Sequence, residues 1–114
     1  MSDIPLFPLS SVLLPYGQMP LQIFEQRYLD LVKDCMRSAS GFGVVWVRRG
    51  AEVAEQGRAQ QDLGDYGTYA RIIDWDQLPN GLLGVTIQGG EIFELDETHR
   101  ASNDLLMGTV RMQS

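Results

Sequence analysis

The stretch Met19-Pro-Leu-Gln-Ile-Phe-Glu-Gln-Arg-Tyr-Leu-Asp-Leu-Val-Lys-Asp-Cys-Met36 decides the fold. Its first residues alternate between apolar and polar, as in a strand, and from Phe24 onward the apolar residues follow a helical period. The spacing places five side chains on one helix face, namely Phe24, Tyr28, Leu31, Val32 and Cys35. We therefore expect a strand that leads directly into an amphipathic helix.

Both ends of this helix carry charge and stop signals. Glu25 falls in the expected first turn, where the helix dipole favours a negative charge, and Arg37 falls near the last turn, where it favours a positive one. Ser38-Ala-Ser-Gly41 follows as a stop. The helix is expected to lie against, or plug, a strongly curved sheet.

Two short apolar segments precede the helix, at residues 4–9 and 12–16. Their three prolines exclude a helix and restrict any strand to an edge or a bulge. We expect four of their side chains in the core: Phe7, Leu9, Leu13 and Leu14.

The chain after the helix is predicted to be mainly strand. Residues 42–47 are apolar on both faces, which is typical of a central strand covered on two sides. Residues 48–67 lose any clear period and predict a long loop, either mobile or functional. Residues 68–75 alternate again and predict a strand.

Turn signals divide the remainder into short strands. Leu78-Pro-Asn-Gly81 predicts a hairpin, and Gly89-Gly90 predicts a second tight reversal. Residues 96–104 read as a polar connection before a last strand at 105–112. The sum is a mainly β chain with one α-helix, arranged as a small curved barrel of about six to seven short strands.

Composition limits the function classes. The 114 residues are 44% hydrophobic, so residues 1–114 can form one domain with its own core. Cys35 is the single cysteine, which excludes an intrachain disulfide and fits a reducing, cytoplasmic compartment. A net charge of −6 opposes nucleic-acid binding, and no apolar run reaches the roughly 20 residues of a membrane-spanning helix.

The residues give no complete catalytic or metal-binding motif. Lys33 is the single lysine and no glycine-rich loop precedes it, so a nucleotide-binding loop is not expected. His99 is the single histidine and is expected in a solvated loop, while Cys35 is expected to be a buried hydrophobe. One cysteine and one histidine cannot form a zinc site, so we expect no metal, no cofactor and no enzyme.

A carboxylate pair remains as an alternative. Asp74 and Asp76 flank Trp75 and could bind a cation or act as acid and base. Near a hairpin end such a pair is more often simply solvated. Asp96 and Glu97 form a second pair of this kind.

Candidate binding residues are amphipathic or soft side chains of the type enriched at protein interfaces. They are Tyr16, Met19, Trp46, Tyr66, Tyr69 and Trp75, although strand positions also suit the core. Glu25, Gln26 and Arg27 are polar neighbours at the helix start and could be displayed to a ligand. Alternatively, Glu25 caps the helix and Arg27 pairs with Asp30.

The chain resembles the Lon protease N-terminal domain, a substrate-binding family with a PUA-like barrel. The resemblance runs in order through Ile4-Pro-Leu-Phe-Pro-Leu9, Val12-Leu-Leu-Pro15, Pro20-Leu-Gln-Ile-Phe-Glu-Gln-Arg-Tyr28, Phe42-Gly-Val-Val45, Gly67-Thr-Tyr-Ala-Arg-Ile72, Leu78-Pro-Asn-Gly81 and Gly89-Gly90 before Phe93. Free-standing bacterial members are more similar than the full protease. Members usually continue into a helical segment, so the resemblance predicts a fragment or a shortened protein.

The resemblance implies a non-catalytic module that recognises unfolded or tagged polypeptide. The ATPase motifs and the serine-lysine peptidase site of the full protease are not expected here, so a protease or chaperone partner would act on the client. A homodimer is a further expectation. The site residues assigned to binding are Tyr16, Met19, Glu25, Gln26, Arg27, Tyr66 and Tyr69. The alternative is RNA binding, which other PUA-like barrels perform and which the negative charge opposes.

Overall fold

The computed structural model describes residues 2–49 and 62–113, which form six strands of one sheet and one helix. The elements are β1 (Ser2–Leu9), β2 (Gln18–Ile23), α1 (Gln26–Ser38), β3 (Phe42–Arg49), β4 (Asp62–Gln77), β5 (Leu83–Arg100) and β6 (Leu106–Met112). The expected mainly β fold with one helix is confirmed, and six strands agree with the predicted number. The expectation of short strands is wrong for β4 and β5, which have 16 and 18 residues.

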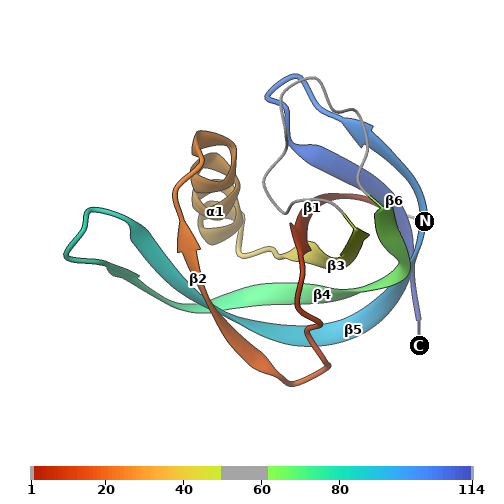
Figure 1. Ribbon diagram of the computed structural model, residues 1–114, viewed down its shortest axis with the longest axis horizontal. Helices are drawn as coiled ribbons and strands as arrows, with labels where there is room; N and C mark the ends of the chain where they lie inside the picture. The colour runs from red at the N-terminus through yellow and green to blue at the C-terminus, as the bar shows by residue number, and fades with distance from the viewer. Residues whose placement is uncertain (1, 50–61, 114) are drawn as a thin grey trace.

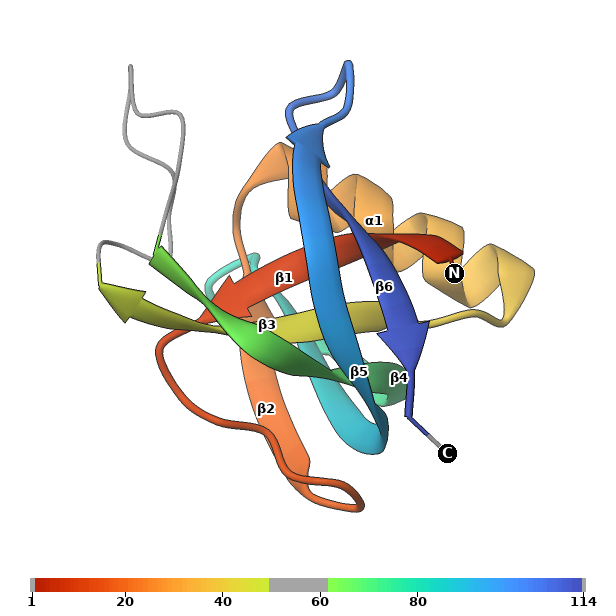
Figure 2. The same cartoon turned by 90° about the vertical axis from the view of Figure 1, so that its right-hand side faces the viewer.

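The sheet closes on itself through β5. The strand order is β2-β5-β4-β3-β1-β6, and an additional pairing joins β5 to β6. β5 pairs with β4 on one side, while on its other side it pairs first with β2 and then with β6. Figure 1 shows β4 and β5 as long curved ribbons below α1, and Figure 2 shows β1, β5 and β6 crossing in front of the helix.

The change of partner along β5 explains one wrong prediction. Gly89-Gly90 was expected to reverse the chain, yet β5 continues through both glycines. At this point the backbone of the 10–17 loop meets β5, because Tyr16 N donates to Gly89 O and Gly89 N donates to Gly17 O. A Cβ atom on Gly89 would lie 2.4 Å from Leu14 O, so a close approach rather than a turn requires this glycine.

The strand β1 lies between β3 and β6 although it contains Pro5 and Pro8. Its registered pairs are with β6 from Ser2 to Pro5 and with β3 from Leu6 to Leu9. Each half of β1 is therefore registered with only one neighbour. A proline in either half lacks the N–H that a ladder needs, and its other side has no registered pair for that N–H to serve. This is how the expected restriction to a sheet edge is met in a strand inside the sheet order.

The helix α1 matches the predicted face with one exception. Tyr28, Leu31, Val32 and Cys35 are buried, but Phe24 precedes the helix and is 58% exposed. The first turn contains no acidic residue, because Glu25 is the N-cap. Arg37 lies in the last turn as expected, and Ala39 ends the helix in the left-handed conformation at φ 54°.

Two core clusters explain why residues 42–47 are apolar on both faces. Phe42 and Val44 of β3 join the cluster below α1, where the Phe7 ring lies 4.3 Å from the Tyr28 ring. Val45 joins the second cluster, with Leu6, Phe93, Leu106 and Val110. The prediction of a central strand covered on two sides is confirmed for these residues. Trp46 is the departure, since it is 43% exposed.

Several loop predictions change. Strand residues occupy 48–49 and 62–67 of the expected 48–67 loop, and its centre, 50–61, lies outside the described residues. β5 extends to Arg100, so most of the expected 96–104 connection, including His99, is strand. The hairpin at Leu78 is confirmed, with Gly81 at φ 85° and its N donating to Leu78 O. Leu14 was expected in the core and is 66% exposed.

We expect Gly89→Ala to destabilise the protein by about 2 kcal/mol, because the added methyl group must displace the backbone at Leu14. Urea unfolding followed by circular dichroism measures this change. Gly90→Ala is the matched control, since its Cβ would lie 3.3 Å from Tyr69 O, and we expect a change within about 0.5 kcal/mol. Equal midpoints for the two variants would contradict the proposed role of Gly89.

Candidate functional site

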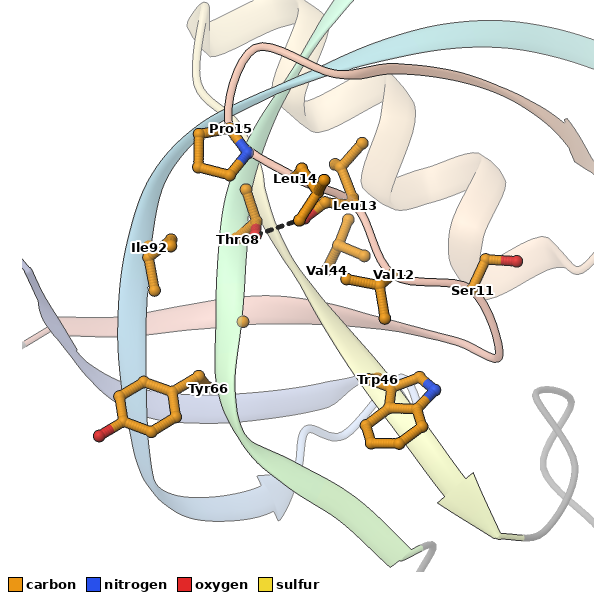
Figure 3. Close-up of a pocket in the computed structure, with 11 residues that line it drawn as sticks. Ser11, Val12, Leu13, Leu14, Pro15, Val44, Trp46, Tyr66, Thr68 and Ile92 are labelled. Carbon is orange, nitrogen blue, oxygen red and sulfur yellow. Dashed lines mark hydrogen bonds between the residues drawn. The ribbon is translucent and has the colours of Figure 1, made fainter.

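An apolar groove lies between the 10–17 loop and the strands β3, β4 and β5. We call it the Trp46 groove, and its volume is about 160 Å³. It is lined by Ser11, Val12, Leu13, Leu14, Pro15, Val44, Trp46, Tyr66, Gly67, Thr68 and Ile92. Figure 3 shows Trp46 and Tyr66 on neighbouring strands at one end of the groove, with Leu14 and Pro15 at the other.

The groove exposes large apolar side chains. Val12, Leu14 and Tyr66 are 59%, 66% and 56% exposed, and Trp46 and Ile92 are also exposed. None of the lining residues is an Asp, Glu, Lys, Arg or His. Contiguous apolar surface of this kind marks an interaction site when it persists on a folded protein.

A buried hydrogen bond fixes the loop that forms one wall. The Thr68 hydroxyl, 6% exposed, donates to Leu13 O over 2.7 Å, as the dashed line in Figure 3 marks. Leu13 is buried and therefore turns inward, while its neighbours Val12 and Leu14 turn outward. Gly17 N donates to Leu14 O and closes the turn in which Tyr16 has φ 66°. The exposed leucine is thus displayed by a fixed backbone.

The residues assigned to binding from the sequence lie at separate places. Tyr66 lies in the groove, and Tyr16 is 83% exposed at the turn that follows its wall. Met19 packs against the core below α1. The Tyr69 hydroxyl accepts a hydrogen bond from Gly41 N at 2.7 Å, which is a structural contact. Gln26 donates to Asp30 on the helix surface.

The Arg27 side chain is engaged within the protein rather than displayed. It is 9% exposed, and its Nε lies 3.1 Å from Glu25 Oε1. Its Nη1 donates to Asp104 O at 2.9 Å, and its guanidinium carbon lies 4.8 Å from the Tyr28 ring centroid. The alternative pairing with Asp30 is wrong, and the Glu25 side chain makes no capping hydrogen bond. Arg27 instead joins the start of α1 to the loop before β6.

Sequence reasoning missed Val12, Leu14 and Ile92 as groove residues. Val12 and Leu14 belong to an apolar run bounded by serines and a proline, which resembles a core segment as closely as an exposed one. The reading of Trp46, Tyr66 and Trp75 as core residues is also wrong, because all three are exposed. Their alternative, the interface reading, agrees with the exposure.

Three titratable side chains contact other groups of the fold, namely Cys35, Asp96 and His99. Burial raises the pKa of the Cys35 thiol, which is 4% exposed and lies 3.5 Å from Gly41 O. Hydrogen bonds from Arg111 lower the pKa of Asp96. His99 Nε2 lies 3.6 Å from Asp3 on the surface of β5. Within residues 2–49 and 62–113, no group of three or more His, Cys, Asp or Glu side chains could hold a metal ion.

Comparison with known proteins identifies the family. The model for the ATP-dependent protease La (LON) substrate-binding domain matches residues 3–113. The chain belongs to this family. The resemblance seen in the sequence motifs is confirmed.

Relatives of this Lon domain include both isolated domains and whole proteases. The crystal structure of a Lon N-terminal domain protein from Xanthomonas campestris superimposes with a TM-score of 0.84 at 37% identity, covering 100% of this chain and 61% of that chain. The N-terminal domain of Mycobacterium avium complex Lon protease shares the fold, with a TM-score of 0.66 at 12% identity. Lon protease 2 of Myxococcus xanthus is 36% identical over 95 residues, which are 82% of this chain and 11% of that protein.

We expect Arg27→Ala to destabilise this Lon domain by about 2 kcal/mol, because it removes hydrogen bonds from a charged, nearly buried donor and leaves Glu25 without its partner. Chemical denaturation measures the loss. Arg37→Ala is the control, since Arg37 and Asp34 form a pair with 76% and 69% exposed side chains, and its cost should be within about 0.5 kcal/mol. If Arg27→Ala were as stable as the unmodified protein, the contacts of Arg27 would not be structural, and a ligand-binding role would again be the better assignment.

We expect Cys35 to react with a thiol reagent such as DTNB at pH 8 only when the protein opens. Burial raises the pKa of the thiol, so the folded protein keeps it protonated where the unfolded chain begins to ionise. The contribution of this group to stability is therefore complete below its ordinary pKa and decreases as the pH rises above it. Rapid labelling of the native protein, at the rate seen in urea, would contradict the buried assignment.

Proposed function

We propose that this chain is a non-catalytic module that binds non-native polypeptide through the Trp46 groove. The observation that carries the proposal is an uncharged, apolar surface, displayed by a loop that the Thr68 hydrogen bond fixes in place. Unfolded chains differ from folded ones mainly by exposing apolar side chains, so such a surface selects them without reading a sequence. The family description as a substrate-binding domain supports the same role.

The volume of the Trp46 groove limits how much of a bound polypeptide can enter it. At about 160 Å³ it is smaller than the roughly 300 to 1,000 Å³ of typical small-molecule sites. It suits one or two apolar side chains of an extended segment, while the Trp46 and Tyr66 rings cover the adjacent backbone. Binding of this size should be weak, with a Kd of about 100 μM, or roughly −5.5 kcal/mol.

RNA binding has no support in the groove. An RNA site needs basic side chains for the phosphates, usually beside aromatic side chains that stack on bases. The groove has the aromatic side chains, but no Lys or Arg is among its lining residues, and the chain has a net charge of −6. Polypeptide is therefore the ligand class that we propose.

The role within proteolysis follows from the relatives. Lon protease 2 of Myxococcus xanthus is matched over 11% of its length, so the chain corresponds to a small part of such a protease. We infer that the bound polypeptide is passed to a protease or chaperone carried by a separate chain or by further sequence. The present residues would supply recognition alone. Within residues 2–49 and 62–113, no helix has the length and hydropathy needed to span a membrane.

We expect the double variant Val12→Ser/Leu14→Ser to weaken binding of a reduced, carboxymethylated model protein at least tenfold. Both side chains are exposed, so the fold should survive, and covering a large apolar side chain is worth roughly 1.5 to 3 kcal/mol when it is complete. Fluorescence anisotropy of the labelled model protein measures the Kd.

Met36→Ser is the matched control, because Met36 is 43% exposed on α1 and is absent from the groove lining. It should bind like the unmodified protein. Equal loss of affinity in both variants would argue for nonspecific adhesion. Sedimentation tests the homodimer: a dimer dissociated by Val12→Ser/Leu14→Ser would assign the groove to a second copy instead of a client.

A further inference from the structure

The turn Leu14-Pro-Tyr-Gly17, at the end of the Trp46 groove, places a bulky residue where glycine is usually required. Gly17 N donates to Leu14 O at 3.0 Å, so these four residues form a hydrogen-bonded β-turn. Its second residue is Pro15, and its third, Tyr16, has φ 66°, which is the combination found in a type II turn. The third position of such a turn favours Gly or Asn, because a Cβ atom is crowded at positive φ. Tyr16 therefore holds a strained backbone conformation.

The Tyr16 side chain makes no contact that would offset this strain. It is 83% exposed, so its ring covers little of the protein. Within residues 2–49 and 62–113, the hydrogen bonds of Tyr16 are made by its backbone, and its ring has no aromatic or cationic neighbour. A packed ring could compensate for the strain, but this ring lies in water. Glycine at position 16 would therefore suit the folded chain better than tyrosine does.

Backbone hydrogen bonds to β5 hold the turn in place. Tyr16 N donates to Gly89 O at 2.9 Å, and Gly89 N donates to Gly17 O at 2.8 Å. Both bonds join backbone atoms, so any residue with an N–H group at position 16 can form them. They fix the backbone from which the ring projects. A ligand that contacts the ring therefore has little backbone entropy to remove.

Tyr16 continues the Trp46 groove beyond one of its ends. Figure 3 shows Leu14 and Pro15 at this end of the groove, with Trp46 and Tyr66 at the other. Position 16 lies two residues after Leu14, so the two Cα atoms are at most about 7 Å apart. Roughly two residues of an extended polypeptide cover the same span. A segment that seats a side chain in the groove therefore reaches Tyr16 with its next residues.

We propose that the Tyr16 ring is a second contact for the polypeptide bound in the Trp46 groove, and that it packs on the residues of the client that extend past Leu14. The inference deepens the proposed function and rests on it. Strain at an exposed position is typical of binding sites, where binding rather than folding supplies the gain. Tyrosine suits the role, because a large ring with few rotatable bonds covers a peptide at a low cost in side-chain entropy.

This contact makes the site selective for an extended chain. An apolar side chain on the surface of a folded protein could enter the groove, but the neighbouring residues of that protein are held in its own fold and would not reach Tyr16. A second copy of this chain is a less suitable partner, because each copy has a net charge of −6. The preferred client therefore has an apolar residue within a disordered stretch.

The first test measures the stability and the affinity of Tyr16→Gly in the whole chain. We expect a higher urea midpoint than in the unmodified protein, because glycine accepts φ 66° without strain. We expect the Kd for the reduced, carboxymethylated model protein to rise about fourfold, since a partly covered ring is lost. Tyr16→Phe keeps the ring, so its Kd should stay within about twofold of the unmodified value.

Ala39→Gly is the matched control for strain. Ala39 ends α1 at φ 54° and is absent from the groove lining. Its replacement should raise the urea midpoint, as in Tyr16→Gly, and should leave the Kd unchanged. The stability gain and the affinity loss are then separate effects of the Tyr16 substitution.

The second test varies the length of the ligand. Two labelled, unstructured peptides share a short apolar segment, and the longer one carries three additional alanine or serine residues at each end. The unmodified protein should bind the longer peptide about fourfold more tightly, because only this peptide reaches Tyr16. Tyr16→Gly should bind both peptides equally, through the Trp46 groove.

The outcomes separate this inference from the proposed function. If Tyr16→Gly binds the denatured model protein as tightly as the unmodified protein does, the Tyr16 contact is overturned and the groove proposal stands. A lower urea midpoint of Tyr16→Gly, or a loss of affinity in Tyr16→Phe as large as in Tyr16→Gly, also overturns the contact. So does a dimer that Tyr16→Gly dissociates in sedimentation. Failure of the unmodified protein to bind the denatured model protein or either peptide overturns the proposed function itself.

Discussion

The long strand β5 must pair with three other strands, and the rest of the structure depends on this constraint. It pairs with β4 from Leu83 to Glu94 and exchanges β2 for β6 on the other side. At the exchange, Gly89 bonds to the 10–17 loop through Tyr16 and Gly17. Because the loop is tied there, its apolar residues lie over β3 and β4 and form a groove. Closure of the sheet and display of the groove thus have one origin.

The Trp46 groove is distinguished by its lack of charged side chains. Such a surface suits the recognition of apolar side chains that we propose for it. Apolar exposure at the groove lowers solubility, and the net charge of −6 acts in the opposite direction.

The sequence predicted those features of the fold that depend on neighbouring residues alone. The burial of Leu31 and Cys35, the apolar faces of residues 42–47 and the turn at Gly81 all follow from spacing or turn chemistry. Leu13 and Leu14 are adjacent in one apolar run, and the hydrogen bond from Thr68, 55 residues away, to Leu13 O fixes the backbone in which Leu13 is buried and Leu14 exposed. Gly89-Gly90 has the composition of a turn, yet contact with Leu14 requires it in a strand. Sequence spacing carries no information about such distant partners.

The pairing of β1 has a consequence for synthesis on the ribosome. Its second half can join β3 once residues 43–46 have emerged, but its first half waits for β6, since Ser2 pairs with Val110. Until then the nascent chain holds an incomplete ring, and Leu6 lacks the Leu106 and Val110 side chains of its core cluster. Early transient contact with a chaperone would protect the apolar side chains that wait for β6.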